Sequence, residues 1–235
     1  MFDLVQNDGR QIASANMSLG GGQSTTTCDS DSRKTIIDNL ISIGVATVIS
    51  SGNSGFQDAT GAPGCISTAV TVGSTTKTDG VSSFSNVAPF MDLFAPGSRI
   101  QSSVGGGNYS FYNGTSLAAP HVAGAFAALK QRFPTESVAS LLTRLQTSGV
   151  PITAGSPAAD YPRIQIDAAM FDPPVASITP GSVSATVAPD AQTTETVTSE
   201  NTAAAGANDL TWAAALQNVQ DETGATGANA CAAGE

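Results

Sequence analysis

The chain contains short runs of apolar, mostly β-branched residues, each followed by glycine or small polar residues. The runs at 12–17, 45–50 and 69–74 have the length and apolar content of strands buried on both faces. The segments 91–97 and 100–104 read as further short strands and loops. Strands of this type occur in parallel sheets, whose two faces are both covered by helices.

A helix is predicted between the first two strands. Its apolar residues recur at helical spacing, at Ile36, Ile37, Leu40 and Ile41. Ser30 or Ser32 is the expected N-cap, and Gly44 is expected to end the helix. Strand, helix and strand in this order make a right-handed crossover. We therefore predict an α/β fold with a mostly parallel sheet flanked by helices.

The longest predicted helix follows the triplet Gly114-Thr115-Ser116. Pro120 needs no amide donor if it lies in the first turn of this helix, and residues 122–129 are apolar on every side. A helix without a polar face is expected to be buried. Ser116 would then lie at the positive end of a buried helix, a position that favours developing negative charge and suits a nucleophile. The alternative is that Thr115 and Ser116 only cap the helix.

A later amphipathic helix is expected to begin at Thr135 or Ser137. Its apolar positions are Val138, Leu141, Leu142 and Leu145. The main domain is predicted to span 1–171, followed by a linker at 172–176 that contains Pro173 and Pro174. Residues 177–235 are rich in Thr, Val, Ser and Ala, with period-two stretches at 183–187 and 194–198. They resemble a partial immunoglobulin-like β-sandwich. The alternative is a flexible tail.

Charge and hydropathy narrow the choice of partners. The net charge is −10, which argues against nucleic acid or an anionic membrane as a partner. No apolar run reaches the roughly 18 residues of a membrane span. Charged residues make up only 12% of the chain, which favours a secreted protein, although no signal peptide is visible at the N-terminus.

Three cysteines cannot all pair within one chain. Cys28 and Cys65 lie in loop-like contexts of the main domain, and Cys231 lies near the C-terminus. Either Cys28 and Cys65 form a disulfide or both are buried free thiols. Neither the spacing of the cysteines nor the single histidine supports a zinc site.

The string from Gly114 to Gly124, GTSLAAPHVAG, resembles the nucleophile segment of the subtilisin-like serine proteases, the subtilases. The resemblance places Ser116 on the catalytic serine. A matching Ser-Gly-Asn-Ser-Gly string at 51–55 implies that Asn53 supplies the oxyanion-hole amide. A neutral donor fixed at a strand end can stabilise charge that develops only in the transition state.

The same resemblance implies the substrate-binding positions. The string 16–21, NMSLGG, is similar to the segment that pairs with extended substrate and forms one wall of the S1 pocket, which assigns Ser18, Leu19 and Gly20. Ser50, Ser51 and Gly52 would form the second wall. Small residues there imply an open pocket without a charged selector.

A base for Ser116 is the missing part. The only histidine, His121, lies five residues later on the same helix, about 140° around its axis, and matches a position of the motif that is not the catalytic histidine. Lys130 is about 21 Å along the helix, and nothing recommends Lys34 or Lys77. In subtilisin the triad runs Asp, His, Ser, so both partners would lie upstream of Met1. The sequence is interpreted as an N-terminally truncated subtilase.

These observations imply a serine endopeptidase that acts on protein or peptide substrates, with the chain alone expected to have little activity. The alternative is a non-catalytic peptide-binding or regulatory protein. A structural cell-surface module centred on 174–235 is the third hypothesis. No cofactor is expected; calcium is common in the family, but no cluster of carboxylates marks a site. The oligomeric state is not predicted.

Overall fold

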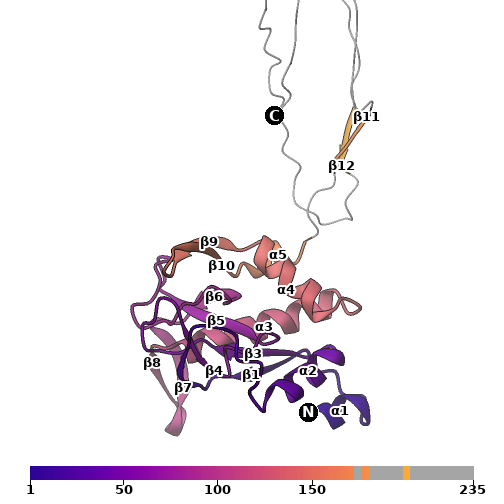
Figure 1. The fold of residues 1–235 in the computed structure, drawn as a ribbon. Helices are drawn as coiled ribbons and strands as arrows, with labels where there is room; N and C mark the ends of the chain where they lie inside the picture. The colour runs from indigo at the N-terminus through magenta and orange to yellow at the C-terminus, as the bar shows by residue number, and fades with distance from the viewer. Residues whose placement is uncertain (172–175, 180–197, 202–235) are drawn as a thin grey trace, which may run out of the picture. The chain divides into compact units, whose positions relative to one another are not determined.

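The computed structural model describes residues 1–171, 176–179 and 198–201 (Figure 1). The chain divides into two compact units, Met1–Met170 and Phe171–Glu235. In the second unit, β11 (Ala176–Thr179) pairs antiparallel with β12 (Thr198–Asn201). The stretch 183–187 and most of the stretch 194–198, expected as strands of a β-sandwich, lie outside the described residues, as do 172–175 of the expected linker.

The first unit is built on a six-stranded sheet with the order β1-β3-β5-β6-β10-β9. All neighbouring strands are parallel except the antiparallel pair β9 and β10, so the predicted α/β class with a mostly parallel sheet is confirmed. The strands are β1 (Ser14–Met17), β3 (Ala46–Ser50), β5 (Val70–Thr75), β6 (Leu93–Pro96), β9 (Val150–Ala154) and β10 (Ala159–Arg163).

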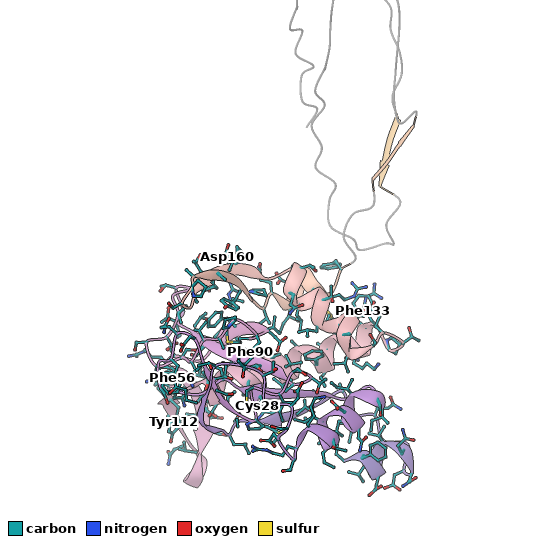
Figure 2. The ribbon with its side chains drawn as sticks, in the orientation of Figure 1. Cys28, Phe56, Phe90, Tyr112, Phe133 and Asp160 are labelled. Carbon is teal, nitrogen blue, oxygen red and sulfur yellow. A yellow bond between two sulfur atoms is a disulfide. The ribbon has the colours of Figure 1, made fainter. Side chains whose placement is uncertain are left out.

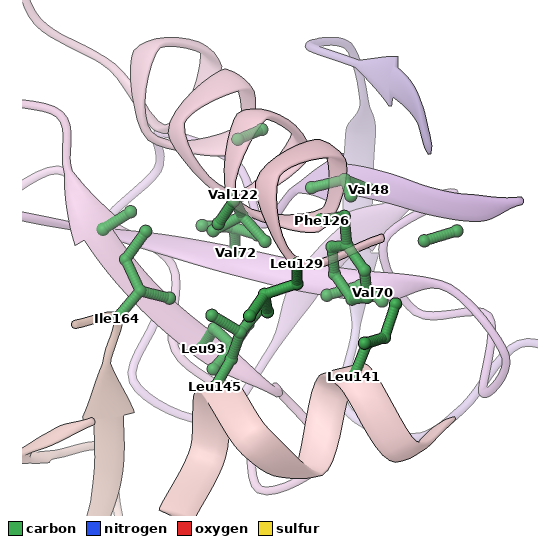
Figure 3. Packing of buried hydrophobic residues seen from close by; sticks show 14 of the residues in the cluster. Val48, Val70, Val72, Leu93, Val122, Phe126, Leu129, Leu141, Leu145 and Ile164 are labelled. Atoms are coloured by element: carbon green, nitrogen blue, oxygen red, sulfur yellow. The ribbon is translucent and has the colours of Figure 1, made fainter. Parts of the chain in front are cut away.

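The helices α2 (Lys34–Ser42), α3 (Thr115–Arg132) and α4 (Val138–Thr147) pack on the sheet, and α5 (Ile166–Ala169) packs on α4. The short helix α1 (Phe2–Gln6) has no buried residue. Successive strand residues point to opposite faces. Val48 therefore packs in the cluster beneath α3 and α4 (Figure 3), whereas its neighbour Ile49 packs with Ile37 of α2.

Further strand pairings and a disulfide complete the unit. β2 (Gly21–Ser24) pairs with β4 (Thr60–Ala62), and β7 (Ile100–Val104) forms a hairpin with β8 (Asn108–Tyr112) through the 3₁₀ turn Gly105–Gly107. Cys28 and Cys65 form a disulfide (Figure 2), which decides between the two alternatives for these cysteines. The disulfide links the segments that follow β2 and β4.

The structure corrects the expected start of α2. Neither Ser30 nor Ser32 caps it; the helix begins after Arg33, which makes no side-chain cap bond. The turn is instead closed by Asp31, whose carboxylate accepts from the Arg33 amide at 2.9 Å. Ile36, expected on the buried face, is 62% exposed, because the face toward the sheet is set by Ile37 and Leu40.

The expectation that α3 is buried on every side was also wrong. One stripe, which includes Val122, Phe126 and Leu129, is fully buried, but His121, Gly124 and Ala127 are exposed in the described structure. Glycine and alanine carry little apolar area, so leaving them in water costs little. By contrast, Ser137 caps α4 as predicted, accepting from the Ser140 amide at 3.1 Å.

Candidate active site

The candidate site forms where the carboxyl ends of parallel strands meet the start of α3. β1 and β3 are parallel neighbours with Met17 opposite Ile49, so the residues after them leave the sheet at the same edge. β6 ends at the same edge, where the Gly97 carbonyl accepts from the Gly114 amide at 2.9 Å. In open α/β sheets this edge is where ligands bind.

Asn53 is held by the first residue of α3. The amide and the hydroxyl of Thr115 both donate to Asn53 Oδ1, each at 2.9 Å, and Thr115 Oγ1 accepts from the Gly52 amide at 3.2 Å. Because Oδ1 takes both donors, Nδ2 is the group of Asn53 that remains to donate to a bound oxygen. Nδ2 lies on the Gly114 side, 3.5 Å from the position a Cβ would take there.

Ser116 lies one residue further into α3 and is half-buried. Its Oγ is 3.4 Å from the Ser18 carbonyl, and Ser18 Oγ donates to the Ser116 carbonyl at 2.8 Å. The first-turn amides of a helix have no intrahelical acceptor, so the Ser116 amide is oriented for an anion at this end. Ser116 and Asn53 are thus brought to one place through Thr115.

The two segments predicted as pocket walls lie side by side. Ser50 Oγ donates to the Leu19 carbonyl at 3.3 Å, and the Leu19 side chain is 50% exposed. Gly20 passes close to β4, since a Cβ at Gly20 would lie 3.1 Å from the Ala62 carbonyl oxygen. The Gly20 backbone is exposed on its open side.

Ser51 differs from the other wall residues because its polar groups are internally bonded. It is fully buried; its amide donates to Val72, its hydroxyl to Asn86, and its carbonyl accepts from the Gly61 amide at 2.9 Å. Ser51 therefore supports the wall from inside the protein rather than facing a ligand with its side chain. Gly52, the next residue, has a φ of 111°, a conformation that favours glycine.

Sequence reasoning gave no role to Asn86. This side chain is 1% exposed, and its Oδ1 accepts from the amides of Ser54 and Phe56 at 2.9 and 3.2 Å. These residues follow Asn53 directly, so Asn86 supports the loop that holds it. No local pattern reveals this role, because the partners lie 30 or more residues away in the chain.

His121 lies on the outward face of α3. It is exposed, and its Nδ1 is 2.7 Å from the Leu117 carbonyl, four residues back on the same helix. Nδ1 is thus the protonated nitrogen that donates, and the ring is committed to its own helix. Lys130 is likewise occupied at the other end of α3, where its Nζ donates to the Glu136 carbonyl at 2.8 Å. Neither side chain joins Ser116.

The carboxyl group with the largest shift in pKa, that of Asp92, lies outside the candidate active site. Burial raises the pKa of Asp92 to about 7, although the Thr71 amide donates to its Oδ2 at 2.7 Å and opposes the shift. Asp92 precedes β6, at the amino ends of the strands, and lines a cavity of about 450 Å³ with Tyr161 and Gln146. Among the described residues no three His, Cys, Asp or Glu side chains gather as metal ligands, and we assign no step to a metal.

Comparison with known proteins identifies the family to which the chain belongs. Residues 3–163, more than half of the chain, match the model of the subtilase family, Peptidase_S8. The chain belongs to the subtilase family. This subtilase chain is 42% identical over 146 residues to alkaline serine exoprotease A of Vibrio alginolyticus, covering 60% of this chain and 26% of the relative. It is 38% identical over 136 residues to subtilisin E of Bacillus subtilis, covering 57% and 34%.

Solved structures agree with this assignment. A cold-adapted subtilisin-like serine proteinase matches the subtilase with a TM-score of 0.54 and 39% identity, covering 62% of this chain and 51% of that one. The prenylagaramide maturation protease PagA matches with a TM-score of 0.59 at 20% identity, which supports the fold alone. The chain spans about a quarter to a third of the two curated relatives, about half of the cold-adapted proteinase and 64% of PagA.

Proposed function

We propose that this chain carries the nucleophile and the oxyanion hole of a serine endopeptidase that cleaves protein or peptide substrates. The observation that supports the proposal is the joint placement of Asn53 and Ser116 at the positive end of α3, both fixed through Thr115. This arrangement suits attack on a carbonyl carbon, because negative charge develops on the carbonyl oxygen within reach of oriented N–H donors.

In the proposed reaction, Ser116 Oγ attacks the peptide carbonyl carbon and its proton passes to a base. The resulting oxyanion accepts from Asn53 Nδ2 and the Ser116 amide. When the C–N bond breaks, the base returns the proton to the leaving amine, and the acyl group stays on Ser116 until water releases it. One side-chain donor of this kind lowers the barrier by about 2.7–4 kcal/mol, a magnitude established on subtilisin itself.

The substrate would lie extended between the two walls. Ser18, Leu19 and Gly20 offer backbone groups on one side, and Ser50 and Gly52 line the other, with Ser51 as internal support. The exposed backbone of Gly20 suits main-chain hydrogen bonding with a peptide. Small side chains on the second wall leave room for an uncharged P1 side chain of moderate size.

The base in this proposal comes from a polypeptide segment outside residues 1–235. His121 is turned away from Ser116, and the chain has no other histidine. β1 is an edge strand of the described sheet, and the outward face of α3 beside it exposes Gly124 and Ala127. An edge strand beside a face of small residues can accept a further strand and the loops that it carries.

We also propose that the protein is secreted. The Cys28–Cys65 disulfide fits an oxidising compartment, and a Thermus relative, 39% identical over 159 residues, is named an extracellular serine proteinase. No helix among the described residues is long and apolar enough to cross a membrane.

Covalent labelling tests the proposed nucleophile. The full chain is incubated at pH 9 with an alkyl fluorophosphonate, which loses fluoride as Ser Oγ bonds to phosphorus, and the modified residue is mapped by mass spectrometry. We expect slow but selective modification of Ser116, and none at that position in Ser116→Ala. Equal modification of Ser116 and of an exposed serine without a carboxylate partner, such as Ser83, would contradict the proposal.

The placement of His121 favours a second candidate, a non-catalytic peptide-binding protein that uses the same walls. Fluorescence anisotropy with an extended, uncleaved peptide distinguishes the two. Tight peptide binding without enhanced Ser116 reactivity favours the second candidate, whereas enhanced reactivity of Ser116 favours the first.

A further inference from the structure

Asn86 lies in the connection between β5 and β6, far in sequence from Asn53, yet its bonds go to the loop that carries Asn53. We propose that Asn86 is a positioning residue that sets the direction of the Asn53 Nδ2 donor; this role rests on the proposed function, in which that donor binds the oxyanion. Asn86 is not a catalytic residue, because it is 1% exposed and lies behind the loop, away from any bound substrate.

The loop after β3 has no secondary structure to satisfy its backbone, so Asn86 provides the partners. On the side before Asn53, Asn86 Nδ2 donates to the Ser51 carbonyl at 3.0 Å, and the Asn86 amide donates to the Gly52 carbonyl at 3.0 Å. Ser51 Oγ returns a bond to the Asn86 carbonyl at 2.8 Å. A buried backbone group without a partner is costly, so these bonds fix the path of the loop.

On the side after Asn53, the same side chain accepts two bonds. Asn86 Oδ1 takes the amides of Ser54 at 2.9 Å and Phe56 at 3.2 Å. One buried amide group therefore holds the residues on both sides of Asn53. Thr115 holds the Asn53 side chain at its Oδ1, so the direction of Nδ2 depends on Thr115 in front and on Asn86 behind.

Packing and hydrogen bonding together restrict position 86 to asparagine. A Cβ added at Gly52 would collide with Asn86 Nδ2, so the loop backbone rests directly on this side chain. The position needs an acceptor for two amides and a donor for one carbonyl in the same planar group, which asparagine alone provides at this size. Aspartate keeps the acceptor but places a second oxygen against the Ser51 carbonyl, and alanine removes both functions.

Side-chain NMR of the full chain tests the proposal without requiring any reaction. The Asn53 side-chain NH₂ pair is assigned by its loss in Asn53→Asp. In Asn86→Ala we expect this pair to shift and broaden toward solvent-averaged values, and the amides of Ser54 and Phe56 to exchange about tenfold faster or more. In Asn86→Asp, which retains the acceptor, we expect a smaller shift and near-normal protection of the two amides.

Labelling kinetics provide the second readout. With the fluorophosphonate, we expect Asn86→Ala to lower the maximal labelling rate of Ser116 about tenfold and to change the half-saturating probe concentration less than about twofold, since only stabilisation of developing charge is lost. Ser82→Ala is the matched control: Ser82 is also buried, but its hydroxyl bonds to Ser74 and Ser98 rather than to the loop. It should leave the Asn53 signals and the labelling rate unchanged.

An unchanged Asn53 NH₂ pair in Asn86→Ala, with Ser54 and Phe56 deprotected, would overturn the proposal. If Asn86→Ala fails to fold, an Asn53 pair in Asn86→Asp identical to that of the wild type would overturn it as well. Failure of the wild-type chain to label at Ser116 would count against the proposed function instead, and the NMR readout would still decide the role of Asn86.

Discussion

The two edges of the central sheet differ in the charge and the hydrogen bonding of their polar side chains. At the carboxyl edge the candidate site is uncharged, and each of its polar side chains has defined partners: Asn53 has Thr115, and the loop around it has Asn86. At the amino edge, Asp92 is a half-buried carboxyl whose pKa is raised by desolvation, and it accepts from one backbone donor, the Thr71 amide. Under the proposed function the carboxyl edge carries the reaction, whereas Asp92 at the amino edge is expected to affect stability alone.

The largest expected effect is that of Asn53→Ala on the labelling rate of Ser116, at the carboxyl edge of the sheet. Asn53→Ala should lower the labelling rate of Ser116 about 100- to 1,000-fold, the effect known for an oxyanion-hole donor, because the charge on the attacked group loses its side-chain donor. The free energy of unfolding should fall by only about 1–3 kcal/mol, because the amide and hydroxyl of the buried Thr115 lose their acceptor while no apolar packing is lost. A rate within a factor of about three of the wild type would remove Asn53 from the proposed oxyanion hole.

Loss of the Cys28–Cys65 disulfide should instead have its main effect on stability rather than on the labelling rate of Ser116. Replacing both residues by serine is expected to lower the free energy of unfolding by about 2–4 kcal/mol, since the bond constrains a 37-residue separation in the unfolded chain. Urea titration measures this change. Cys231→Ala is introduced in both proteins so that only the disulfide differs, and an equal midpoint in the two proteins would contradict the prediction.

The amino edge predicts a pH effect on stability. The pKa of Asp92 is raised to about 7 in the folded protein, so between about pH 4 and pH 7 the folded chain keeps a proton that the unfolded chain has lost. The stability contribution of this proton is present at low pH and disappears as the pH rises through 7. The substitution Asp92→Asn retains an acceptor for the Thr71 amide and removes the ionisable group.

The measurement is therefore the free energy of unfolding of wild type and Asp92→Asn at pH 5 and pH 8, with a chelator present so that no divalent cation neutralises the carboxylate. The difference between the two proteins should move by roughly 2 kcal/mol in favour of Asp92→Asn at pH 8. A difference that does not depend on pH would show that Asp92 ionises normally. Ser116 labelling should be the same in both proteins.

The sequence predicts the parts of the fold that local periodicity determines. Buried runs predict β1, β3 and β5, and Ser137 predicts the start of α4. The pairing of β2 with β4, the β7–β8 hairpin and the antiparallel β9–β10 pair at the sheet edge depend on contacts that no periodic pattern marks. The face of α3 that contains Gly124 and Ala127 was misjudged because alanine and glycine count as apolar yet need no burial.

The candidate site shows the same division. Ser116, Asn53 and the wall residues were predicted from strings that resemble a family, and the structure places Ser116 and Asn53 together. Asn86 could not be found in this way, since its role arises from hydrogen bonds to residues 30 to 35 positions away. Such buried polar groups become recognisable only when the loop that they support is folded.

The pH dependence of Ser116 labelling tests most directly the claim that this chain holds a nucleophile and an oxyanion hole without a base. Without a general base the logarithm of the rate should rise by about one for each pH unit from 6 to 9, because hydroxide or the alkoxide carries the reaction. His121→Ala should follow the same line within about twofold. A plateau above pH 7 that disappears in His121→Ala would show that His121 acts as the base and would contradict the account.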